Sequence, residues 1–176
     1  MKILMLAVIA AACVTPQAAP PKLDKGDMHR FLFFAVYEGL WEDGFETGSL
    51  SPVLKNVEEH FVTKCHICNA VRQAIRAYAF APKDQLQNEG KGTNPPKEVA
   101  DGLKSEKREE RLKAIQLLVD RYVARRFDRV KMTDDERRQM KSILDDERKR
   151  GMSAKGSGFG DFCPSCDGAT GAKPKK

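Results

Sequence analysis

Hydrophobic residues recur along the chain at the spacing of an α-helix, and no segment alternates hydrophobic and polar residues as a strand does. The first helical run follows Asp27, which we expect to cap a helix that ends near Glu42. Phe34, Tyr37 and Trp41 share one face of this helix. Because aromatic residues at helical spacing usually pack inward, we expect that face to be buried.

Two further helices are predicted in the middle of the chain. Ser51 and Pro52 have the residue types that favour a helix cap and a first helical position. A third helix is predicted to begin near Cys68 and to end before Pro82, which cannot continue it. The expected buried face of the third helix comprises Val71, Ile75 and Tyr78.

The second half of the chain predicts one long helix and one capped helix. The long helix is expected from about Lys97 to Val130, and the last helix from the Thr133–Glu136 capping box to Gly151. The expected buried stripe of the long helix comprises Leu112, Ile115, Leu118, Val119, Tyr122, Val123 and Phe127. The pattern therefore predicts an all-α fold of about five helices, followed by an irregular glycine-rich segment.

The N-terminus has the composition of an export signal. Residues 1–12 contain one lysine followed by apolar residues, which is typical of a signal peptide and too short for a permanent membrane span. Ala10 and Ala12 precede Cys13, and this segment resembles a bacterial lipobox. The resemblance implies a lipid on Cys13 and a proline- and alanine-rich tether over residues 13–26. We expect a lipoprotein of the bacterial envelope, with periplasmic or secreted protein as the alternative.

The length of the chain suggests where the domain begins and ends, and its charge pattern argues against a nucleic-acid partner. The 176-residue chain suits a single helical domain, expected over residues 27–168, with a basic tail over residues 169–176. Its net charge is +6, from 31 Lys and Arg against 25 Asp and Glu. The most basic helical surface comprises Arg121, Arg125, Arg126 and Arg129. Aspartates are interleaved with these arginines and export is expected, so we expect no nucleic-acid partner.

Two C-x-x-C pairs are the strongest sign of chemistry in the sequence. Cys65 and Cys68 form the first pair, and Cys163 and Cys166 form the second. The second pair resembles the metal-binding knuckles of zinc ribbons and rubredoxins. Four thiolates suit a tetrahedral zinc ion with no open coordination position. We therefore predict a structural zinc site that pins the glycine-rich segment to the helical domain.

Three other uses of the same cysteines remain open. Exported proteins ordinarily hold cysteines in disulfides, so two structural disulfides are one alternative. Thiol–disulfide redox chemistry and iron-based electron transfer are the others. Haem attachment is excluded because Asn69 and Asp167 stand where that motif requires histidine. His60 and His66 lie close enough in sequence to replace a sulfur ligand, whereas nothing in the sequence selects His29.

No motif of a known catalytic site appears in the chain. The acidic clusters at Glu42–Asp43 and Glu58–Glu59–His60 have the composition of exposed helix surfaces. An enzyme is therefore not the favoured class. The sequence favours an exported, metal-binding structural protein, with an unidentified protein as its expected partner and the membrane as its anchor.

Overall fold

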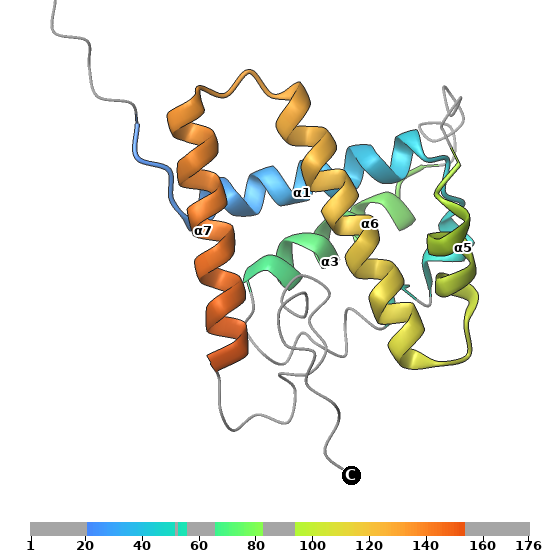
Figure 1. Ribbon diagram of the computed structural model, residues 1–176. Coiled ribbons are helices and arrows are strands. Elements are labelled where there is room, and N and C mark those ends of the chain that lie inside the picture. The colour runs from blue at the N-terminus through green and yellow to red at the C-terminus, as the bar shows by residue number, and fades with distance from the viewer. Residues whose placement is uncertain (1–20, 52, 56–65, 83–93, 154–176) are drawn as a thin grey trace, which may run out of the picture.

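The described part of the chain folds into helices joined by short connections. The computed structural model describes residues 21–51, 53–55, 66–82 and 94–153 (Figure 1). Within these ranges lie five α-helices and one 3₁₀ helix, and no strand: α1 (Lys25–Glu42), η1 (Thr47–Leu50), α3 (His66–Ala79), α5 (Lys97–Lys104), α6 (Arg108–Arg129) and α7 (Asp134–Ser153). The all-α prediction is confirmed for these residues. The glycine-rich segment follows α7 and lies outside them.

α1 begins three residues earlier than the sequence pattern predicts. Asp24, and not Asp27, is its N-cap, so the prediction of the cap was wrong. The Asp27 N–H donates to Asp24 Oδ1 at 2.9 Å, and the Asp24 N–H donates to Asp27 Oδ2 at 3.0 Å. The two aspartates thus form a reciprocal capping box at the positive end of the helix dipole, which stabilises both charges.

The predicted long helix is interrupted, so α5 and α6 are separate helices. Ser105 lies at the break, where its Oγ accepts a hydrogen bond from the Lys107 N–H at 3.1 Å and donates to Glu110 Oε2 at 2.6 Å. A serine side chain that binds a nearby backbone N–H competes with the helical hydrogen bonds. Hydrophobic periodicity carries no sign of this competition, because the residues on both sides of the break keep the helical spacing.

The break allows α5 to pack closely beside α6. A Cβ atom on Gly102 of α5 would lie 2.7 Å from the Ala114 Cβ of α6, which is closer than real contacts of this kind. Leu103 of α5 is buried at the same interface, in one cluster with Leu112 and Ile115 of α6. The small residues therefore set how near the two helices approach.

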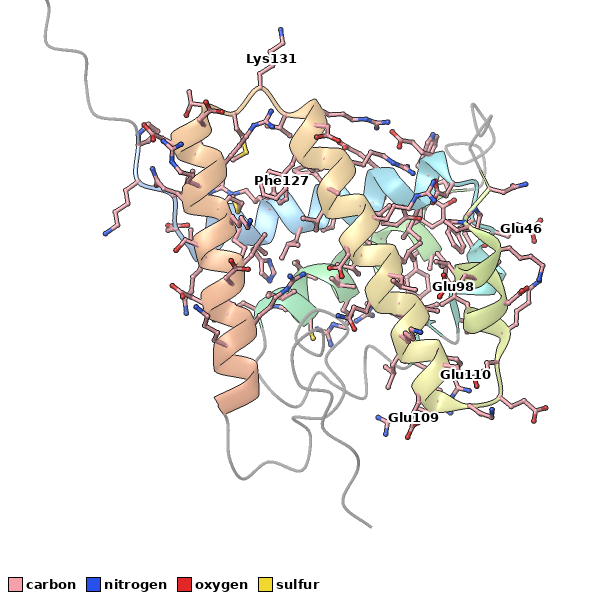
Figure 2. The ribbon with its side chains drawn as sticks, viewed as in Figure 1. Glu46, Glu98, Glu109, Glu110, Phe127 and Lys131 are labelled. Atoms are coloured by element: carbon pink, nitrogen blue, oxygen red, sulfur yellow. The ribbon has the colours of Figure 1, made fainter. Side chains whose placement is uncertain are left out.

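α1 joins two apolar clusters. The first connects α1 with η1, α3, α5 and α6, and includes the buried side chains of Leu40, Leu50 and Tyr122. The second connects α1 and α3 with α7, through Met28, Phe31, Leu32, Ile67, Ala70, Met140 and Leu144. Phe127 of α6 extends the second cluster, with its ring centroid 4.7 Å from that of Phe31 (Figure 2).

The buried face of α1 differs from the predicted one. Phe34 is 45% exposed, so the predicted buried face was wrong for this residue, whereas Tyr37 and Trp41 are partly buried and pack against the first cluster. The buried residues of α1 are Met28, Phe31, Leu32, Ala35, Val36, Gly39 and Leu40. α1 contacts three helices, α3, α6 and α7. Its buried residues therefore cover a wider face than the single stripe that the spacing predicts.

The other helix predictions hold with small shifts. α3 begins two residues before the predicted start, and its predicted face of Val71, Ile75 and Tyr78 is buried. The capping box of α7 is confirmed, because the Glu136 N–H donates to Thr133 Oγ1 at 3.2 Å and the Thr133 N–H donates to Glu136 Oε2 at 2.7 Å. α7 continues two residues past its predicted end.

Two predicted segments lie largely outside the described residues. Ser51 and residues 53–55 are helical, which agrees with the start of the second predicted helix. The predicted signal peptide, residues 1–12, is outside the described ranges. Among the helices that are described, none combines the length and apolar composition needed to cross a bilayer.

Candidate functional site

Of the cysteines selected from the sequence, the structure describes Cys68. This residue lies in the first turn of α3, is 2% exposed, and is disulfide-bonded. Cys65, Cys163 and Cys166, together with the predicted lipidation site Cys13, lie outside the described residues. The helix start predicted beside the first pair is confirmed, because α3 begins at His66.

The predicted zinc site stays a prediction. No group of three histidine, cysteine, aspartate or glutamate side chains that could hold a metal ion occurs among the described residues. Zinc binds cysteine as thiolate, and the N-terminal end of a helix favours that charge. The disulfide-bonded Cys68 carries no thiolate, so zinc binding there requires the reduced form of the pair.

Two histidines that are distant in sequence lie together, and one of them, His66, precedes Cys68 by two residues. His29 in α1 and His66 in the first turn of α3 have ring centroids 6.4 Å apart, with their planes at 81°. Burial is the main cause that lowers the pKa of His29, and the charge of His66 lowers it further. Sequence reasoning missed His29 because its partner is brought to it only by the packing of α3 against α1.

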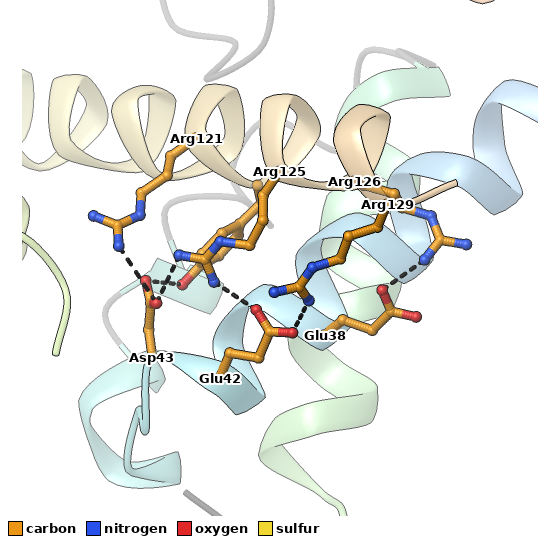
Figure 3. A network of polar contacts seen from close by, with 8 residues as sticks. Glu38, Glu42, Asp43, Arg121, Arg125, Arg126 and Arg129 are labelled. Carbon is orange, nitrogen blue, oxygen red and sulfur yellow. Dashed lines mark hydrogen bonds and ion pairs between the residues drawn. The ribbon is translucent and has the colours of Figure 1, made fainter. Parts of the chain in front are cut away.

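The largest polar network connects the C-terminal end of α1 with α6. Carboxylates of α1 and its C-cap contact arginines of α6 in what we call the acid–arginine ladder (Figure 3): Glu38, Glu42 and Asp43 with Arg121, Arg125, Arg126 and Arg129. Arg125 Nη1 donates to Glu42 Oε2 at 2.7 Å, and its Nη2 donates to Asp43 Oδ1 at 3.0 Å. Arg126 Nη1 donates to Glu38 Oε2 at 2.6 Å. All four arginines of the basic stripe therefore contact carboxylates of the same chain.

Asp43 is the buried member of the ladder. Its 1% exposure shows that the interpretation of Glu42–Asp43 as exposed surface was wrong for this residue. The Tyr122 hydroxyl donates to Asp43 Oδ2 at 3.1 Å, and Arg121 Nη2 lies 3.8 Å from Oδ1. Burial, followed by the negative charge of Asp43, raises the pKa of Tyr122 far above its usual range, so the phenol stays protonated and can donate.

The backbone after α1 turns Asp43 inward. The Gly44 N–H donates to the Trp41 carbonyl at 3.1 Å and the Phe45 N–H to the Leu40 carbonyl at 3.2 Å, the two bonds of a Schellman ending. Gly44 has a φ of +64°, which glycine adopts without strain. The acidic residues thus lie at the negative end of the α1 dipole, and the arginines of α6 supply the compensating positive charge.

Arginine and aromatic side chains extend the ladder along α1. The Arg126 guanidinium carbon lies 5.8 Å from the Phe31 ring centroid and 5.3 Å from that of Phe34. Cation–π contact of this kind accounts for an exposed phenylalanine at position 34. A signal for the ladder does exist in the sequence, because Glu38–Glu42 and Arg125–Arg129 are both spaced four apart and can face each other across two helices.

A cavity of about 970 Å³ lies between the end of α1, η1, α5 and the start of α6. Its apolar wall includes Phe45, Ala100 and Leu103, and its charged lining includes Lys55, Lys104, Glu46, Glu106, Arg108 and Arg111. The Arg111 guanidinium already donates to the carbonyls of Ser105 and Glu106, at 2.8 and 2.6 Å. The described lining contains no histidine or cysteine, so it offers neither a thiol nucleophile nor an imidazole base.

Comparison of the chain with models of protein families, with curated proteins and with solved structures finds no match.

Proposed function

We propose that this protein is an exported helical protein with a structural or interaction role, in which the four paired cysteines fasten the C-terminal segment to α3. The observation that carries this proposal is Cys68, which is buried in the first turn of α3 and disulfide-bonded. A cross-link at a buried helix start holds its partner segment against the core. The cross-link would join the segment that follows α7 to the helices that precede α7 in one folded unit.

The disulfide form of the cross-link is the favoured one. Disulfides persist in exported proteins, and the expected signal peptide places the chain in that class. Closing a long loop in this way stabilises a protein by about 2–4 kcal/mol. Zinc held by Cys65, Cys68, Cys163 and Cys166 is the second candidate, favoured by the C-x-x-C spacing.

Peptide mapping without reduction tests the fastening. Cleavage after lysine and arginine leaves Cys65 and Cys68 in one peptide and Cys163 and Cys166 in another. We expect the two peptides to be joined until a reductant is added. Disulfides confined within each peptide, in a chain without zinc, would contradict the proposed link between α3 and the C-terminal segment.

A thiol count and metal analysis of the Cys13→Ser variant, which keeps only the four paired cysteines, separate the two forms. Four blocked cysteines and no metal support the disulfide form. Four free thiols, one zinc ion per chain, and loss of zinc in Cys163→Ser support the second candidate. Free thiols without metal would refute both.

The proposed export and lipid anchor have their own test. In a bacterium that makes the full chain, we expect the protein in the membrane fraction and released by Cys13→Ser. Cys68→Ser is the matched control, because it removes a cysteine without affecting the proposed lipid site. Equal membrane retention of both variants would refute lipidation at Cys13, and retention in the cytoplasm would refute export.

A further inference from the structure

A buried nitrogen of His29 has no hydrogen-bond partner among the described residues. This atom, Nε2, belongs to a side chain near the N-terminal end of α1. Buried polar atoms without partners are rare in folded proteins, since each has lost its hydrogen bonds to water without a replacement. The surroundings of Nε2 should therefore show what this nitrogen could bind.

The other ring nitrogen of His29 determines what Nε2 can bind. A hydrogen bond with the backbone of His66 raises the pKa of His29, in opposition to burial, as donation to a carbonyl oxygen does. Because Nε2 has no partner, we assign this bond to the other ring nitrogen, Nδ1. A neutral imidazole with its proton on Nδ1 presents a lone pair at Nε2.

This arrangement is the one that metal-binding histidines use. Such residues donate one ring N–H to a carbonyl or carboxylate, which fixes the ring and leaves the opposite nitrogen free to bind the ion. A second imidazole is already beside it, because the His66 ring centroid lies 6.4 Å away. His66 is exposed, so its ring can turn towards an ion held by His29.

We propose that His29 and His66 bind a divalent transition-metal ion, of the class that includes Zn²⁺ and Cu²⁺, through one nitrogen each. Imidazole suits both ions. The site does not use Cys68, whose sulfur is in a disulfide. It is therefore distinct from the four-cysteine zinc site and does not depend on which form of the cysteine cross-link is correct.

The test measures binding of Zn²⁺ and Cu²⁺ to the full chain after alkylation of every free thiol. We expect one ion per chain, and affinity reduced by at least about tenfold in both His29→Gln and His66→Gln. His60→Gln is the matched control, because His60 is the remaining histidine of the chain. Electron paramagnetic resonance of the Cu²⁺ complex should show two coupled nitrogens in the native chain and one in each of the two variants.

Several outcomes would overturn the proposal. These are no ion bound by the alkylated chain, affinity unchanged in His66→Gln, or affinity lost in His60→Gln instead. Binding that appears only after reduction, without alkylation, would assign the ion to the cysteines. Since His66 is exposed, its replacement leaves the core intact, and far-ultraviolet circular dichroism of each variant verifies that the helices remain.

Discussion

At the scale of the residue, Asp43 is the side chain on which the ladder depends most. It is buried, and it receives hydrogen bonds from Tyr122 and Arg125. Taking a carboxylate out of water is costly, and here two donors and a nearby second guanidinium offset the cost. Removing its charge would leave those donors facing a weaker acceptor inside the protein.

We expect Asp43→Asn to lower the free energy of unfolding by about 3 kcal/mol, the order found when one partner of a buried ion pair is removed. Urea unfolding followed by circular dichroism measures the change. Glu46→Gln is the control, since that carboxylate is exposed, and its effect should stay within about 0.5 kcal/mol. Equal effects of the two substitutions would show that Asp43 is not a stabilising centre.

At the scale of the element, the crossing of α1 and α6 depends on a close approach at one glycine. A Cβ atom on Gly39 would lie 2.2 Å from Tyr122 Cδ1, well inside van der Waals contact. Tyr122 cannot withdraw easily, because its ring is buried and its hydroxyl is bonded to Asp43. The two helices therefore depend on the absence of a side chain at this position.

We expect Gly39→Ala to destabilise the protein by up to about 2 kcal/mol, although alanine is the better helix former. The overpacking cost exceeds the gain in helix propensity of about 1 kcal/mol. Gly48→Ala is the matched control, because a Cβ there meets nothing within 4 Å. Thermal unfolding of both variants compares them, and a stabilised Gly39→Ala would contradict the close approach.

The start of α1 predicts a specific acid sensitivity. Hydrogen bonds from the backbone N–H groups of Asp27 and Gly26 hold the pKa of Asp24 below its ordinary value of 3.8. The unfolded chain therefore binds the proton first as pH falls. The stability that the Asp24 charge contributes is present above pH 3.8 and is lost as pH falls through the lower folded pKa.

Asp24→Asn tests this acid sensitivity, because asparagine caps a helix without titrating. Wild type should be the more stable of the two at neutral pH, and the difference should shrink as the pH is lowered below 3.8. Urea unfolding at a series of pH values measures this difference. A difference that is constant with pH would contradict the role given to the Asp24 charge.

At the scale of the whole molecule, the ladder reduces how much of the net positive charge is available to a binding partner. Arginines that would form a basic stripe on an isolated helix are paired with α1 carboxylates, and Arg125 and Arg126 are largely covered. Salt-dependent attraction to nucleic acid needs cations that meet phosphates directly. Folding therefore reduces the positive charge that this face presents to a partner.

We expect the native protein to leave a heparin column at low salt and the double variant Glu38→Gln, Glu42→Gln to be retained to higher salt. Both substitutions free guanidinium groups without adding a positive residue. Glu98→Gln with Glu109→Gln is the control for the same change in net charge, because both glutamates are exposed and neither belongs to the ladder. Equal retention of the two double variants would mean that overall charge, and not the ladder, governs binding.

The helices were predictable wherever their signals were local. The α7 capping box, the buried face of α3 and the all-α class follow from side chains within a few residues of one another. The break at Ser105 was not predictable from periodicity, because a side-chain hydrogen bond causes it. The Asp24 cap was missed because two aspartates at the correct spacing compete for one helix start.

The candidate sites also divide into those with a local sequence signal and those without one. Sequence spacing selects the four cysteines, since a C-x-x-C pair is a local feature. It cannot select His29 or the buried state of Asp43, whose partners are 37 and 79 residues away in sequence, at His66 and Tyr122. Local spacing thus identifies the all-α class and most of the described helices, but not every helix boundary. Which charged and imidazole side chains meet depends on the tertiary structure, because burial and pairing arise only when helices pack.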